Sequence, residues 1–289
     1  MHAGETVLAG AVDAFRDELG DRLLAAYALG SLAHGGFSPL VSDVDLGLIV
    51  RDPARSDDGE RIQAVADAVR AEGSELCERL SVFWACESTL RGEQGGGRLP
   101  ALDRLDLIEN GRLLAGTDAR DDLPRPSTEE LLVAGAEFAL DFLAGVQDPS
   151  GPATQGLGSM RLAEADAVEE LRSPDLLLAR GVRRVTKLVL FPVRFLFTAA
   201  NGRVGTNDAA VAHYLADTEA PSRTLVAAAL AWRTVPPADE KAAAELLRDE
   251  MVPLYVRYID DHITRLDSLG HAELARAFDA WRGRLVLRV

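Results

Sequence analysis

The sequence predicts an α+β N-terminal domain, in which helices flank a small mixed sheet, followed by an all-α domain built as a helical bundle. Three observations predict this order. Short apolar runs with strand character alternate with helical patterns as far as residue 122. The stretch 117–128 holds two prolines, several acidic residues and little apolar content, which is typical of a linker. Beyond it, long helical patterns follow one another, with no convincing strand before the last few residues.

We therefore expect one domain over residues 1–122 and a second over 123–289. In the first domain, apolar runs predict strands over 23–29, 44–50 and 80–85, and helical spacing predicts helices over 5–20, 60–71 and 103–114. In the second, helices are expected over 129–146, 160–171, 176–200, 208–215, 223–232 and 239–266. Pro192 and Pro253 lie inside two of these helices and are expected to kink or break them.

The charge balance of the chain bears on its partners. The formal net charge is −15. A protein that binds DNA or RNA usually presents a basic face, so nucleic acid is not the expected partner. A neutral or cationic small molecule suits an acidic protein better, although net acidity that serves solubility alone explains the charge equally well.

Cysteine usage and hydropathy bear on location. Cys77 and Cys86 have neither the number nor the spacing of a disulfide framework or a CxxC motif. We expect reduced thiols and a cytoplasmic protein. No apolar run approaches the roughly 20 residues of a transmembrane helix, so no membrane partner is expected.

The most informative segment spans residues 28–50. An apolar strand leads into Gly30-Ser31, a loop with glycines and a proline follows, and a second apolar strand begins at Asp43-Val44-Asp45. Residues at positions i and i+2 of a strand point to the same face, so Asp43 and Asp45 present two carboxylates side by side. Adjacent anions favour a cation between them, and Mg²⁺ takes carboxylate oxygens together with substrate phosphate oxygens. The pair therefore predicts a divalent-metal site.

Gly30 and Ser31 suit a neighbouring phosphate. Glycine lets the backbone approach a phosphate closely, and Ser31 with the amides after it is able to donate hydrogen bonds to a triphosphate. Taken singly these signals are weak, because a hairpin turn with two solvated carboxylates has the same residues. Their order is far more specific: strand, Gly-Ser, eleven residues, Asp-apolar-Asp, strand.

This segment resembles the signature of the polymerase β-type nucleotidyltransferases, and more closely that of the bacterial streptomycin/spectinomycin adenylyltransferases. The matching residues are Gly30-Ser31, Gly35-Gly36, Pro39 and Ser42-Asp43-Val44-Asp45-Leu46, with a loop one residue longer between Pro39 and Ser42. Fainter matches run through 111–118 and from Arg194 to 201–210. The resemblance implies a nucleotide site on the first domain and an acceptor in the cleft between the domains.

The implied reaction is metal-dependent transfer of AMP from ATP to a hydroxyl of a small molecule, for which an aminoglycoside-like acceptor is a candidate. Asp43 and Asp45 would bind Mg²⁺, and Gly30 and Ser31 would bind the nucleotide. A cationic acceptor would also suit the charge of the chain.

The helical half adds further candidates. Lys187 and Arg194 belong, with Arg184, to a basic stripe at near-helical intervals that is able to turn toward the triphosphate. Pairing of the stripe with the acidic surface is an equally good interpretation. One helical segment carries four acidic residues, Glu164, Asp166, Glu169 and Glu170. This segment is a candidate to face a cationic acceptor, and the alternative is that it forms an ordinary solvated helix face.

The chain also departs from the family's pattern. Members normally carry a third carboxylate on a later strand, which binds metal or acts as general base, and Ser81 occupies that position here. Serine is a poor metal ligand and no base near neutral pH. Glu78, Glu87 and Asp106 are candidates to replace it, although each is expected to be an ordinary surface carboxylate. Asn207 stands where the family has a lysine near the nucleotide phosphates.

These departures predict a slow enzyme and leave two alternatives open. One is a nucleotide-binding pseudoenzyme, which the missing carboxylate favours. The other is a nucleotidyltransferase that modifies a protein or tRNA. The net charge argues against tRNA, and the large helical half argues against a minimal enzyme of that kind.

Overall fold

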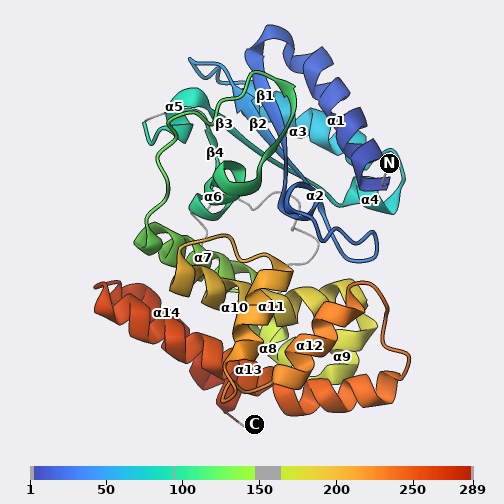
Figure 1. Ribbon diagram of the computed structural model, residues 1–289, viewed down its shortest axis with the longest axis vertical. Coiled ribbons are helices and arrows are strands. Elements are labelled where there is room, and N and C mark those ends of the chain that lie inside the picture. Colours follow the sequence, from blue (N-terminus) through green and yellow to red (C-terminus); the bar gives the residue numbers. More distant parts are fainter. Residues whose placement is uncertain (1–2, 94, 147–163, 288–289) are drawn as a thin grey trace. The chain divides into compact units, whose positions relative to one another are not determined.

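The computed structural model describes residues 3–93, 95–146 and 164–287. Over these residues the chain divides into two compact units, of which the first ends at Pro126 and the second begins at Ser127. The first unit holds a mixed sheet with flanking helices, and the described part of the second is helical (Figure 1). The fold class expected from the sequence is therefore confirmed. The independently folding domains expected at 1–122 and 123–289 stay a prediction.

The sheet of the first unit has five strands in the order β4-β3-β2-β1-β5. β2 and β3 run parallel, and every other neighbouring pair is antiparallel. The strands expected at 23–29 and 44–50 are present with those bounds, and the one expected at 80–85 extends by one residue. The bounds are β1 Leu23–Leu29, β2 Val44–Val50, β3 Leu80–Cys86, β4 Gly97–Arg98 and β5 Arg112–Gly116.

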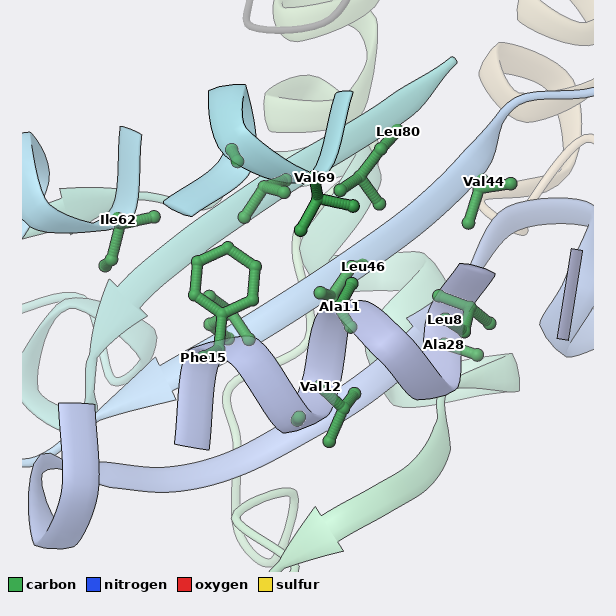
Figure 2. Close-up of a cluster of buried hydrophobic side chains, with 14 of the residues drawn as sticks. Leu8, Ala11, Val12, Phe15, Ala28, Val44, Leu46, Ile62, Val69 and Leu80 are labelled. Atoms are coloured by element: carbon green, nitrogen blue, oxygen red, sulfur yellow. The ribbon is translucent and has the colours of Figure 1, made fainter. Parts of the chain in front are cut away.

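Alternation along the strands gives the sheet two apolar faces. One face packs against α1 (Ala3–Leu19) and α3 (Asp58–Arg70), and Figure 2 shows Phe15 of α1 and Ile62 of α3 in the same cluster of buried side chains as Leu46 of β2. The other face packs against α6 (Ala101–Asn110), where Leu107 joins residues of β1 and β2 in a second core. A strand that is buried on both faces has a near-continuous run of apolar residues. The sequence of β2 shows this pattern from Leu46 onward.

Short helices connect these strands. They are a 3₁₀ turn at Gly20–Arg22, α2 at Gly30–His34, α4 at Glu75–Glu78 and α5 at Glu87–Leu90. Cys77 and Cys86 are free and buried, and burial raises the pKa of the Cys86 thiol. Both are thiols, as the spacing predicts.

The prediction of a helix over 103–114 is wrong for residues 112–114. α6 ends at Asn110, and residues 112–116 form β5, in which Leu113 pairs with Tyr27 of β1. Helical and strand periodicity are hard to separate in a run as short as Leu113-Leu114-Ala115, and the exposed edge of β1 offers backbone partners that decide the outcome. Gly116 closes the strand with a φ of 85°, and a side-chain carbon there would overlap the Leu24 carbonyl.

A polar network ties the chain after β5 back to the sheet. The buried Tyr27 hydroxyl donates to Asp118 Oδ1 at 2.9 Å and accepts from the Ala119 amide at 2.6 Å. Arg120 pairs with Asp118 at 2.6 Å and lies 5.6 Å from the Tyr27 ring centroid. Burial raises the pKa of Tyr27 to about 12, and hydrogen bonds from Arg120 hold the pKa of Asp118 well below its usual range.

Helices make up the described part of the second unit. They are α7 Thr128–Phe142, α8 Glu164–Arg172, α9 Pro174–Ala179, α10 Val182–Asn201, α11 Asn207–Ala216, α12 Arg223–Trp232, α13 Glu240–Ser268 and α14 Ala272–Val286. The start expected at 160 lies outside the described residues. The helix expected at 176–200 is two helices, with a break at Arg180-Gly181, and α14 was not expected. Neither Pro192 nor Pro253 ends its helix.

An aromatic core joins four of these helices. Phe138 of α7 lies 5.5 Å from Phe191 of α10, and Phe195 of α10 lies 6.2 Å from Tyr258 of α13. Tyr258 in turn lies 5.8 Å from Phe278 of α14. Edge-to-face and tilted ring pairs of this kind stabilise beyond their buried area. No helix of the described residues is both long and apolar enough to cross a bilayer.

Candidate active site

The mixed sheet brings the motif residues to one end. β1 is antiparallel to β2, so the carboxyl end of β1, which leads into Gly30-Ser31, lies beside the amino end of β2. Leu29 pairs with Asp45 across these strands. β3 is parallel to β2, so its amino end lies there too, and Asp45 pairs with Ser81. The structure therefore places Gly30, Ser31, Asp45 and Ser81 at the same end of the sheet.

Gly30 is the tightest point of this arrangement. It begins α2 with a φ of 58°, in the left-handed region that favours glycine. A side-chain carbon at Gly30 would overlap Asp45 Oδ2. Only a residue without a side chain therefore allows both the turn and the orientation of Asp45.

Asp43 and Asp45 are both half-buried, with Asp43 two residues earlier, just before β2 begins. Over the described residues, no three His, Cys, Asp or Glu side chains lie close enough to enclose a metal ion by themselves. Mg²⁺ is commonly bound by one or two carboxylates, with substrate phosphates and water completing its shell. A donor set of two carboxylates at the Gly30-Ser31 turn fits that kind of site.

Ser81 has no carboxylate to add to this pair. It is 3% exposed, and its pairing with Asp45 puts both side chains on the sheet face that α6 covers. A hydroxyl in this place offers a hydrogen bond, but it is neither a strong metal ligand nor a base.

The three replacement candidates differ in position. Glu78 is exposed. Glu87 follows the carboxyl end of β3, at the opposite end of the sheet from Asp45, and strands of this length span roughly 20 Å. Asp106 is 8% exposed, so the expectation of a surface carboxylate is wrong for this residue.

Asp106 makes direct contact with the motif. Its Oδ2 accepts a hydrogen bond from the Gly30 amide at 2.6 Å, and its Oδ1 accepts one from Asn110 Nδ2 at 2.9 Å. Sequence reasoning named Asp106 without recognising this role. The available signal was its place between Leu105 and Leu107, which are both buried, on a helix that covers the sheet.

In the second unit, Lys187 and Arg194 are both half-buried on α10. They are seven residues apart, which is close to two helical turns, so they share a face. Arg194 Nε donates to the Gly205 carbonyl at 2.6 Å, and its guanidinium lies 5.7 Å from the Phe191 ring centroid. These contacts restrain the orientation of the Arg194 side chain.

Arg184 has a different role from these two. It is buried and donates to Glu170 of α8 at 2.6 Å, and Glu170 is buried as well. For Arg184, the expectation of a turn toward a triphosphate is therefore wrong, because its guanidinium compensates a buried carboxylate. The pair also removes Glu170 from the surface that was a candidate to face an acceptor, whereas Asp166 and Glu169 are exposed.

Comparisons with known proteins add a structural likeness. No protein-family model matches the chain, and no curated protein matches it by sequence. A crystal structure of the spectinomycin adenyltransferase AAD(9) from Enterococcus faecalis, with ATP and spectinomycin, matches with a TM-score of 0.51. The match covers 86% of this chain and 98% of that one at 14% identity.

The chain has the fold of a spectinomycin adenyltransferase. This confirms, at the level of the fold, the resemblance that residues 28–50 indicate. At this identity the likeness concerns the fold alone, and the roles of individual residues rest on the geometry described above.

Proposed function

We propose that the chain is a nucleotidyltransferase that transfers AMP from ATP to a hydroxyl of a small molecule. One observation carries the proposal: Asp45 lies against the Gly30-Ser31 turn at the amino end of β2, with Asp43 two residues away. This is the arrangement that nucleotidyl transfer needs, because it joins carboxylates for a metal ion to donors for a triphosphate. The fold likeness to an enzyme crystallised with ATP and spectinomycin supports it.

Different residues of the first unit bind the phosphates and the metal ion. The Ser31 hydroxyl and the amides after it donate hydrogen bonds to phosphate oxygens, and Gly30 leaves room for their approach. Asp43 and Asp45 hold Mg²⁺, which when bound neutralises charge on the phosphates. Lys187 and Arg194 of α10 add positive charge for the triphosphate. The sequence resemblance supports this role for Arg194, and the helical spacing that puts Lys187 on the same face supports it for Lys187.

In the transfer, the acceptor oxygen forms a bond to the α-phosphorus while the bond from that phosphorus to the pyrophosphate oxygen breaks. The hydroxyl proton leaves to solvent, because Ser81 is no base. Positioning and charge neutralisation supply most of the rate in phosphoryl transfer, so a site without a dedicated base still catalyses, but slowly. The net charge of −15 favours a cationic acceptor, and an aminoglycoside-like compound meets that need.

Calorimetry tests the proposed site. Wild-type protein should bind ATP in the presence of Mg²⁺ and much more weakly in EDTA. Asp45→Asn should lose this metal dependence, while Asp13→Asn, the same change at an exposed residue of α1, should keep it. Equal and metal-independent binding by all three proteins would show that Asp45 holds no metal.

Transfer itself is tested with ATP labelled at the α-phosphate and a library of aminoglycosides and other hydroxylated acceptors. Label that moves to an acceptor, with release of pyrophosphate, supports the proposed reaction. The buried Ser81 beside Asp45 favours a second function, that of a nucleotide-binding pseudoenzyme. Tight binding of Mg²⁺ and ATP with no transfer to any acceptor, protein or tRNA would support the pseudoenzyme.

A further inference from the structure

Asp106 is an acidic residue on the buried side of α6. Carboxylates are seldom buried unless they are paired, because loss of hydration disfavours their charged form. Among the described residues, the Gly30 amide donates to one oxygen of this carboxylate and the Asn110 side chain donates to the other. Both of its oxygens are thus engaged by neutral donors of the protein.

The Gly30 amide gains an acceptor that its own helix does not supply. The first amides of a helix have no intrahelical partner, and Gly30 is the first residue of α2. Hydrogen bonds to an ionised acceptor are shorter and stronger than neutral ones, in keeping with the 2.6 Å distance. Asp106 therefore joins α6 to the turn at the end of β1.

Gly30 contacts a carboxylate on another side as well. The space beside its Cα is taken by Asp45 Oδ2. A shift of Gly30 would change both the room for Asp45 and the direction of Ser31, the next residue in the chain. The bond from Asp106 to Gly30 thus fixes the backbone between two groups of the proposed site.

We propose that Asp106 is a positioning residue for nucleotidyl transfer, which acts by holding the Gly30 amide and thereby the orientation of Ser31 and Asp45. Its catalytic effect rests on the proposed function, whereas the bond itself does not. Asp106 acts through its hydrogen bond to Gly30, while the Asn110 side chain holds its other oxygen.

Two variants separate the hydrogen bond from the charge. Asp106→Leu has no acceptor for the Gly30 amide, so that hydrogen bond is lost. In Asp106→Asn, the amide oxygen still accepts from Gly30, and its nitrogen donates to Asn110, whose amide group turns to present its oxygen. Asp106→Asn thus keeps both hydrogen bonds and removes the negative charge.

For Asp106→Leu we expect kcat for AMP transfer to fall about 10- to 100-fold, the effect of losing a hydrogen bond to a charged group. Asp106→Asn should stay within about threefold of wild type, since positioning requires the hydrogen bond and not the charge. A rate for Asp106→Asn as low as that of Asp106→Leu would mean that the charge at 106 is needed, and would overturn the proposal.

A second readout is independent of catalysis. Hydrogen exchange of the Gly30 amide, measured by NMR on the full chain, should be slow in wild type, at least tenfold faster in Asp106→Leu and slow in Asp106→Asn. Asn110→Ala, which keeps Asp106, should leave Gly30 protected and serves as the matched control. An unchanged Gly30 exchange rate in Asp106→Leu refutes the positioning role even if transfer is normal.

The two readouts keep the failures apart. If wild-type protein binds no ATP with Mg²⁺ and transfers no AMP, the proposed function fails, and the Gly30 exchange rates still decide whether Asp106 holds the turn. If transfer proceeds but Asp106→Asn is as slow as Asp106→Leu, the function stands and the positioning role fails. Thermal unfolding of each variant shows whether a loss of activity reflects loss of the fold.

Discussion

Asp45 and Ser81 lie directly opposite each other in the parallel pairing of β2 with β3. An acid at position 81 would therefore project beside Asp45 on the face that α6 covers. Ser81→Asp should raise turnover by about tenfold or more, part of the 10²- to 10⁴-fold that a well-placed base contributes. Steady-state rates of AMP transfer measure the gain.

The same change should make stability depend on metal. A buried third carboxylate next to Asp45 destabilises the protein through like-charge repulsion, and Mg²⁺ with ATP relieves it. The melting temperature of Ser81→Asp should fall below wild type in EDTA, and Mg²⁺ with ATP should raise it by more than they raise that of wild type or Ser81→Asn. A rise in Ser81→Asp no larger than that in wild type would mean that position 81 lies away from the metal.

Gly30→Ala tests the turn between Ser31 and Asp45. An L-residue with a φ near 58° costs roughly 1–2 kcal/mol, and the added methyl group overlaps Asp45 Oδ2. We expect a comparable loss in the free energy of unfolding and a loss of Mg²⁺-dependent ATP binding. Gly10→Ala is the control, because a side-chain carbon in this part of α1 meets nothing and alanine favours a helix. Chemical denaturation and calorimetry on both variants distinguish local strain from a general effect.

Arg184 and Lys187 lie on the same helix and should differ in what they support. Among the described residues, Arg184→Met leaves the buried Glu170 with the more distant Arg180, at 3.8 Å, and should lower the free energy of unfolding by about 3 kcal/mol. Lys187→Met should change stability little and weaken ATP binding. Urea denaturation and calorimetry of the two variants separate these effects, and a large stability loss in Lys187→Met would contradict its proposed role.

His262 makes stability depend on pH. Burial lowers its pKa, and Asp261 opposes this only in part. The unfolded chain therefore takes up a proton on His262 more readily than the folded one, so its contribution to stability is present above about pH 6.5 and is lost as the pH falls. The unfolding free energy of wild type relative to His262→Phe should be lower at pH 5.5 than at pH 7.5. A constant difference would mean that His262 titrates alike in both states.

Sequence patterning predicted some elements of this chain better than others. The strands at 23–29 and 44–50 were correct to the residue because each is an apolar run that ends at turn-forming residues. The run at 113–115 was misassigned because its pairing with β1 depends on a partner distant in sequence. Patterning also missed α14, which the aromatic contacts of Phe278 and Trp281 hold in the second unit.

The candidate site was likewise predicted only in part from the sequence. Local order in the chain was enough to group Gly30, Ser31, Asp43 and Asp45, because two adjacent strands carry them. It was not enough to show that Asp106 faces Gly30, a contact across 76 residues of sequence. Nor could it tell Arg184 from Lys187, since helical spacing gives a shared stripe but not which side chain meets a buried acid.

The opposite end of the sheet has a practical use. Residues 51–57 after β2 are exposed there, roughly 20 Å from Asp45, while Cys77 and Cys86 are buried. A thiol introduced by Arg55→Cys would thus be far more accessible than either native one. A fluorophore attached at that point would leave the Gly30-Ser31 turn untouched. Nucleotide binding could thus be followed by fluorescence, with no change to the groups proposed to perform the chemistry.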